Sequence, residues 1–226
     1  MTALNEHIVT DIDREQVLRD IGYEDTERVP TRVLTLLDDY LETVEVLISP
    51  SYCCVIKEVD LVHSPDSVLE GVVPVQSRVL SRLLKHCDRA ALFCLTIGEH
   101  LEEKVSALAE EGHAVQARML DALGSSAVES LADIVQEDVE ELARANGLYS
   151  SRRFSPGYCD WQIDQQEVLF SALDGCQAGV QLGEGCLMTP RKSVSGLIGM
   201  GRSPEMVKDY NPCLTCPRLD CCGRRA

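Results

Sequence analysis

The sequence predicts an α+β fold in which helices surround a largely antiparallel sheet. A long segment at 114–145 carries apolar residues at helical spacing, whereas 51–62 and 89–97 are rich in the β-branched and apolar residues of strands. These segments do not alternate regularly, as the strands and helices of a doubly wound parallel sheet would. We therefore expect mixed elements in one domain at 1–205, followed by a cysteine-rich tail at 206–226.

Caps and helix breakers delimit the shorter elements. Asp13 and Asp164 are suitable N-caps, and Pro30 suits the first turn of a helix. In the long segment, 124–126 (Gly-Ser-Ser) is where a helix can kink. Helices are expected at 13–21, 30–49, 75–84 and 164–173, with a strand near 193–199 that forms a hairpin through a turn at 189–192.

The charge of the chain excludes two classes of function. Among its 226 residues, 37 are acidic and 21 are basic, which gives a net charge of −16. Nucleic acids and anionic membranes both attract basic surfaces, so we expect neither as a partner. No apolar run approaches the ~20 residues that span a bilayer, and the first residues lack the features of a secretory signal. We expect a cytoplasmic protein whose eleven cysteines are thiols or metal ligands rather than disulfides.

Three segments contain residues that suit ligand binding. In Arg153-Phe154-Ser155-Pro156-Gly157-Tyr158, the arginine offers a planar fork for a carboxylate, Pro-Gly permits close backbone approach, and Tyr158 supplies a ring or hydroxyl. Glu129, on the flank of the long helix, is a candidate receptor for an ammonium group. The third segment, 184–196, fits a simple hairpin. Taken singly, each has a plain alternative: a Pro-Gly turn with a surface arginine, a solvated glutamate and a hairpin without function.

Together, the three segments resemble a known family. From about Gly124 to Gly201 the sequence is similar to the activation domain of vitamin B12-dependent methionine synthase, which binds S-adenosylmethionine (AdoMet). The first half, to about residue 110, resembles stand-alone relatives of that domain. The matching pieces occur in the order of the family: Ser126-Ala127-Val128-Glu129, Arg153 to Tyr158, Leu182-Gly183-Glu184, and Met188-x-Pro190-x-x-Ser193-Val194-Ser195-Gly196.

The resemblance implies a role for each matching residue. Arg153 would contact the methionyl carboxylate of AdoMet within an R-x-x-x-G-Y motif that includes Gly157, and Glu129 would meet the methionyl ammonium. Tyr158 and the backbone near Asp160 would line the nucleoside. The family usually has Thr and Ser around the glutamate of the third segment, but here Glu184 lies between glycines, and the resemblance assigns it no role.

The implied function is reactivation of a cobalamin cofactor. Cob(II)alamin regains its methyl group from AdoMet together with one electron, and the cobalt itself attacks the methyl group. The protein then supplies position rather than an acid, base or nucleophile, so no catalytic residue is expected. The corrinoid-binding signature Asp-x-His-x-x-Gly does not occur among the 226 residues. We therefore expect the cobalamin on a partner, a corrinoid-binding methionine synthase or methyltransferase subunit, and a separate electron donor.

The tail predicts a metal site. Cys213, Cys216, Cys221 and Cys222 lie within ten residues and suit zinc or an iron–sulfur cluster. A thiol-rich end without metal is the alternative. The other cysteines, including the pair Cys53-Cys54, are expected to be packing or incidental thiols. The tail leaves a second hypothesis open: an iron–sulfur or zinc accessory protein that transfers electrons, or docks a corrinoid protein, without AdoMet chemistry.

Overall fold

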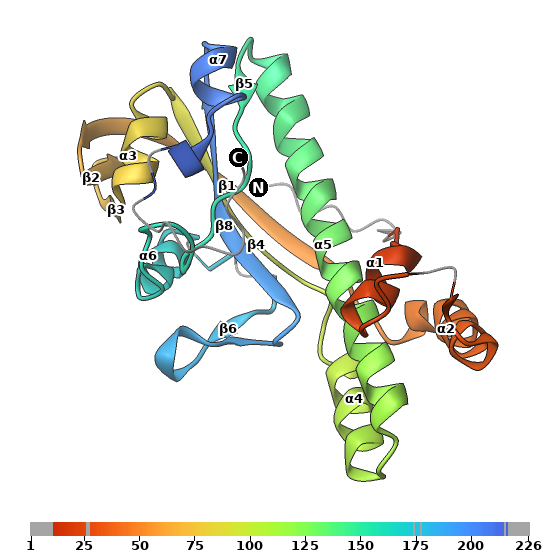
Figure 1. Cartoon of the computed structure of the whole chain (residues 1–226). Coiled ribbons are helices and arrows are strands. Elements are labelled where there is room, and N and C mark those ends of the chain that lie inside the picture. The colour runs from red at the N-terminus through yellow and green to blue at the C-terminus, as the bar shows by residue number, and fades with distance from the viewer. Residues whose placement is uncertain (1–10, 26–27, 174, 177, 215, 217–226) are drawn as a thin grey trace.

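A six-stranded antiparallel sheet forms the centre of the molecule (Figure 1). The structure is a computed structural model that describes residues 11–25, 28–173, 175–176, 178–214 and 216. The strand order is β3-β2-β1-β4-β8-β5. The expected α+β class, with helices around an antiparallel sheet, is confirmed. The strands are β1 (Ser51–His63), β2 (Asp66–Leu69), β3 (Val73–Gln76), β4 (Arg89–Thr96), β5 (Tyr149–Ser150) and β8 (Ser193–Gly201).

Strand β4 is buried on both faces of the sheet. It pairs with β1 on one side and β8 on the other. Alternate side chains of a strand point to opposite faces, and Phe93 packs into one core while Leu92 packs into the other, each at most 1% exposed. Burial on both faces explains why this strand is a continuous apolar run rather than an alternating one.

Four helices form the layer on one face of the sheet, with α5 against the strands and the other three packed against α5 (Figure 1). They are α1 (Arg14–Asp20), α2 (Thr31–Thr43), α4 (His100–Glu110) and α5 (Ala114–Ala145). The sequence predicted α5 correctly, and the helix runs without interruption through 124–126, where the sequence suggested a possible kink. A Cβ at Gly124 would lie 2.7 Å from Leu101 Cδ2, so the glycine lets α4 pack closely instead. No helix in the described part of the chain is long and apolar enough to cross a membrane.

The other face carries α3 (Arg78–Leu84) and α6 (Gln165–Ala172). The predicted helix over 75–84 is too long, because Val75 and Gln76 belong to β3 and Ser77 caps α3. The hairpin predicted through 189–192 is also wrong. β7 (Met188–Thr189) pairs with β6 (Gln181–Leu182) in a separate ribbon, whereas β8 pairs with β4 and β5. Local turn residues could not reveal these distant partners.

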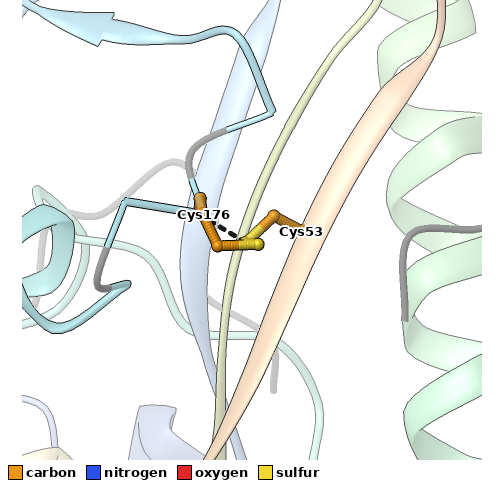
Figure 2. Close-up of a disulfide and its surroundings, with 2 residues drawn as sticks. All are labelled: Cys53 and Cys176. Atoms are coloured by element: carbon orange, nitrogen blue, oxygen red, sulfur yellow. Dashed lines mark hydrogen bonds between the residues drawn. A yellow bond between two sulfur atoms is a disulfide. The ribbon is translucent and has the colours of Figure 1, made fainter. Parts of the chain in front are cut away.

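A disulfide joins β1 to the segment after α6, between Cys53 and Cys176 (Figure 2). The expectation that all cysteines are thiols or metal ligands is therefore wrong for this pair. Cys53 belongs to the core cluster beneath α6, whereas its neighbour Cys54 packs against the cluster under α5. The alternation of side chains along β1 explains why only one of the two adjacent cysteines reaches Cys176.

The outer edge of β8 is only partly covered. β5 pairs with Met200 and Gly201, and the chain then follows β8 as far as a bridge between Phe154 and Leu197. The Phe154 and Leu197 amides each donate to the other's carbonyl, at 2.9 and 2.8 Å. Among the described residues, no strand pairs with β8 beyond this bridge on that side, so Ser193 to Ser195 form an open edge.

Glycine at position 196 makes this close approach possible. A Cβ there would overlap the Phe154 carbonyl oxygen and lie 2.9 Å from the Phe93 ring. We expect Gly196→Ala to lower the free energy of unfolding by about 1–3 kcal/mol through overpacking. Gly183→Ala is the control, because Gly183 has a negative φ and its Cβ would lie 3.5 Å from the nearest atom. It should change stability by no more than about 0.5 kcal/mol. Equal denaturation midpoints for the two variants would contradict this packing.

Candidate functional site

A cavity of about 740 Å³ opens at the uncovered edge of β8. The open edge supplies Ser193, Val194 and Ser195, while α5 contributes Glu129 and α6 contributes Gln166. The segment from Arg152 to Cys159 lines it as well, apart from Gly157. The volume is in the range of about 300–1,000 Å³ that is common for small-molecule sites. Three of the predicted ligand residues, Glu129, Arg153 and Tyr158, thus meet at one cavity.

Arg153 is held against α5 by three acceptors. Its Nη1 donates to the Ala132 carbonyl and to Asp133 Oδ1, both at 2.7 Å, and its Nη2 lies 3.5 Å from Glu129 Oε2. Only 22% of the Arg153 side chain is exposed, compared with 67% for Glu129 and 69% for Asp133. Arg153 is therefore an anchored group with a carboxylate beside it, not the loose surface arginine of the plain alternative.

The Pro-Gly turn places Tyr158 at the rim of the cavity. Gly157 has a φ of +93°, a conformation that favours glycine, and its amide donates to the Trp161 carbonyl at 2.8 Å. Tyr158 is 71% exposed and lines the cavity. The sequence suggested that Gly157 allows a ligand to approach, but in the structure its clearest role is to allow a positive φ that closes the turn.

Asp160 makes a structural contact that the sequence did not predict. Its carboxylate accepts hydrogen bonds from Ser77 Oγ (2.5 Å), the Arg78 amide (2.8 Å) and the Val79 amide (3.3 Å). It thereby caps the N-terminus of α3, where unpaired amides favour a negative group. Asp160 does not belong to the wall of the cavity as the described residues define it. A backbone contact to the nucleoside at this position stays a prediction.

The beginning of the tail forms another part of the wall. After α7 (Pro204–Val207), Tyr210 donates to the Val79 carbonyl at 2.9 Å, and Cys213 and Cys216 reach the cavity. There they meet Cys159, which the sequence suggested to be only a packing or incidental thiol. Burial, and then the nearby Cys216, raise the pKa of the Cys159 thiol to about 12. Its place directly after Tyr158 was the only signal for it in the sequence.

The structure describes two of the four cysteines that the sequence predicts as metal ligands, Cys213 and Cys216. Cys221 and Cys222 lie outside the described residues. Within the described part, no three potential ligands are arranged to hold a metal ion. A metal site formed by the four tail cysteines therefore stays a prediction.

Comparison with solved structures identifies the class of fold. The chain is similar to a protein described as the MetH reactivation domain bound to AdoHcy, with a TM-score of 0.62 and 18% sequence identity. The match covers 83% of this chain and 69% of the other. At this identity the likeness shows a shared fold, that of a methionine synthase reactivation domain. A comparison with curated proteins found no match.

The family follows from the sequence match. The model of the family described as "Vitamin B12 dependent methionine synthase, activation domain" matches residues 79–206, more than half of the chain. The chain therefore belongs to this family, which confirms the resemblance found in the sequence. The matched region includes α5, the Arg153 to Tyr158 segment and β8, each of which contributes to the wall of the cavity.

The cap formed by Asp160 can be tested separately from ligand binding. We expect Asp160→Ala to lower the free energy of unfolding by about 1–2 kcal/mol, because three donors at the start of α3 lose their acceptor. Asp164→Ala is a matched control, since Asp164 occupies the N-cap of α6 without a side-chain capping bond. Chemical denaturation should show a clear loss for the first variant and little for the second. An unchanged midpoint for Asp160→Ala would refute the capping role.

Proposed function

We propose that this chain binds AdoMet in the cavity beside β8 and reactivates the cobalamin of a methionine synthase, or of a related corrinoid methyltransferase, that is a separate protein. The observation that carries the proposal is the pair formed by Arg153 and Glu129, 3.5 Å apart on the wall of the cavity. The family match and the AdoHcy named for the similar structure support it.

The residues present suit an amino-acid ligand joined to a nucleoside. The methionyl end is a zwitterion, and Arg153 and Glu129 offer one group for its carboxylate and one for its ammonium. Since Ala132 and Asp133 already fix one edge of the Arg153 guanidinium, its other nitrogens keep their position when a ligand enters. The open edge at Ser193 to Ser195 and the exposed Tyr158 leave room and contacts for the larger nucleoside.

The protein would act mainly by positioning. AdoMet, when bound, supplies the methyl group that cobalamin accepts. Arg153 and Glu129 would fix the amino-acid end, and Tyr158 would contact the nucleoside at the rim. Holding two reactants in a productive geometry replaces a rare encounter in solution. This role needs no acid, base or nucleophile from the chain.

The proposal requires a cobalamin bound outside these 226 residues, since none of them forms the corrinoid-binding signature. The test mixes the purified chain with AdoMet, a chemical reductant and a corrinoid-loaded methionine synthase that lacks its activation domain. We expect the visible spectrum to change from cob(II)alamin to methylcobalamin only when the chain is present. If the chain binds the corrinoid protein but AdoHcy shows no binding in calorimetry, the accessory role without AdoMet chemistry is correct instead.

Arg153 provides the first test of the binding site itself. A hydrogen bond to a charged group contributes about 1.5–3 kcal/mol, so Arg153→Ala should weaken AdoHcy binding by roughly 10- to 150-fold. Arg144→Ala is the control, because Arg144 pairs with Glu140 one turn away on the exposed surface of α5. Isothermal calorimetry measures both variants, with thermal unfolding to verify their folds. If Arg153→Ala binds AdoHcy like the wild type, the assignment is wrong.

Substitution of the two carboxylates beside Arg153 should weaken AdoHcy binding to different extents. Glu129 lines the cavity, whereas Asp133 contacts the guanidinium and is not part of the described wall. We therefore expect Glu129→Gln to weaken AdoHcy binding by about tenfold, through loss of the charge that meets the ammonium. Asp133→Asn should weaken it by about threefold or less, since the Ala132 carbonyl still holds Arg153. Calorimetry that shows the opposite order would exclude Glu129 as the ammonium receptor.

A further inference from the structure

A buried amide on the wall of the cavity lacks a hydrogen-bond partner. Gln166 lies in the first turn of α6, and only 3% of its surface is exposed. Its backbone amide donates to the Ile163 carbonyl, but within the described residues its side-chain Nε2 has no acceptor. Native proteins seldom leave a buried polar group unpaired, and the exceptions usually have a functional reason.

Among the described residues, no hydrogen bond from the Gln166 Nε2 helps to hold α6 in place. Its neighbour Gln165 accepts a hydrogen bond from the Gln76 amide at 3.0 Å, and so ties the start of α6 to the sheet. Within the described part of the chain, two other buried side-chain atoms are unpaired, on Gln136 and Trp161, but neither residue lines this cavity. Gln166 is therefore the residue whose missing partner coincides with the candidate binding site.

The position of α6 indicates which part of a ligand this amide would contact. Glu129 belongs to α5, which covers one face of the sheet, whereas α6 packs on the opposite face (Figure 1). The cavity is lined from both helices. A ligand whose amino-acid end lies at Arg153 and Glu129 would extend its nucleoside toward α6.

We propose that the side-chain amide of Gln166 binds the nucleoside of AdoMet, with its NH₂ group donating to an acceptor of the adenosine. This inference rests on the proposed function, because it assumes AdoMet in the cavity. It adds a second anchor to the site: Arg153 holds the charged end, and Gln166 selects ligands that carry a hydrogen-bonding nucleoside. Ligand binding then provides the partner that the amide lacks.

The test uses the full chain, two ligands and two matched variants. Gln166→Met removes the amide at nearly constant length, and Gln162→Met makes the same change at an exposed residue outside the cavity wall. The ligands are AdoHcy and 5′-methylthioadenosine, which has the nucleoside but no amino-acid group. Calorimetry gives the affinities, and thermal unfolding of the ligand-free proteins gives their stability.

We expect Gln166→Met to weaken both ligands by the same factor, roughly five- to tenfold, and Gln162→Met to change neither. Arg153→Ala should weaken AdoHcy far more than 5′-methylthioadenosine, because it acts on the other end. Ligand-free Gln166→Met should melt no lower than the wild type, since it removes an unpaired buried group. A lower melting temperature with unchanged affinities would mean a purely structural role and overturn the inference.

The outcomes also separate this inference from the function on which it rests. If AdoHcy binds, depends on Arg153 and is indifferent to Gln166→Met, then the proposed function stands and the role of Gln166 is refuted. If the wild type binds neither ligand, the proposed function fails and the Gln166 assignment fails with it.

Discussion

The contact between the Phe154 backbone and Gly196 is the constraint on which the site depends. It lets the segment after β5 lie along the edge of β8 as far as Leu197 and no further. The same contact sets Arg153 against α5 and leaves Ser193 to Ser195 as an open edge. The covered half of β8 thus supports the segment with the arginine, and the uncovered half forms the floor of the cavity.

Electrostatics then decides what this cavity can accept. Arg153 is mostly buried and lies beside two carboxylates, those of Glu129 and Asp133. The guanidinium is fixed by the Ala132 carbonyl and by Asp133, while Glu129 stands beside it at the wall. Opposite charges held at this separation suit a zwitterion better than a simple anion. The side-chain Nε2 of Gln166, which has no partner among the described residues, adds a polar group at a second helix, α6.

The sequence correctly predicted the helices and strands whose formation depends on residues close together in the chain. Helical spacing predicted α5, alternation with β-branched residues predicted β1, and an apolar run predicted β4. Asp13 caps α1 as expected, accepting from the Gln16 amide at 3.0 Å. The motif of Arg153, Gly157 and Tyr158 was visible because its residues are adjacent. The β2–β3 pair, the partners of β7 and the Cys53–Cys176 disulfide were not, because each depends on contacts between distant segments.

The sequence alone therefore determined the family, the α+β class and most of the residues proposed to hold AdoMet. Only the tertiary structure decided how those residues are used. It placed the Asp160 carboxylate on the N-terminus of α3 and brought Cys159 to Cys216. It also left the side-chain Nε2 of Gln166 at the cavity without a partner among the described residues. Each outcome depends on which side of a strand or helix meets a segment far away in the chain. Such contacts depend on the packing of the whole molecule, so the residues close together in the sequence do not reveal them.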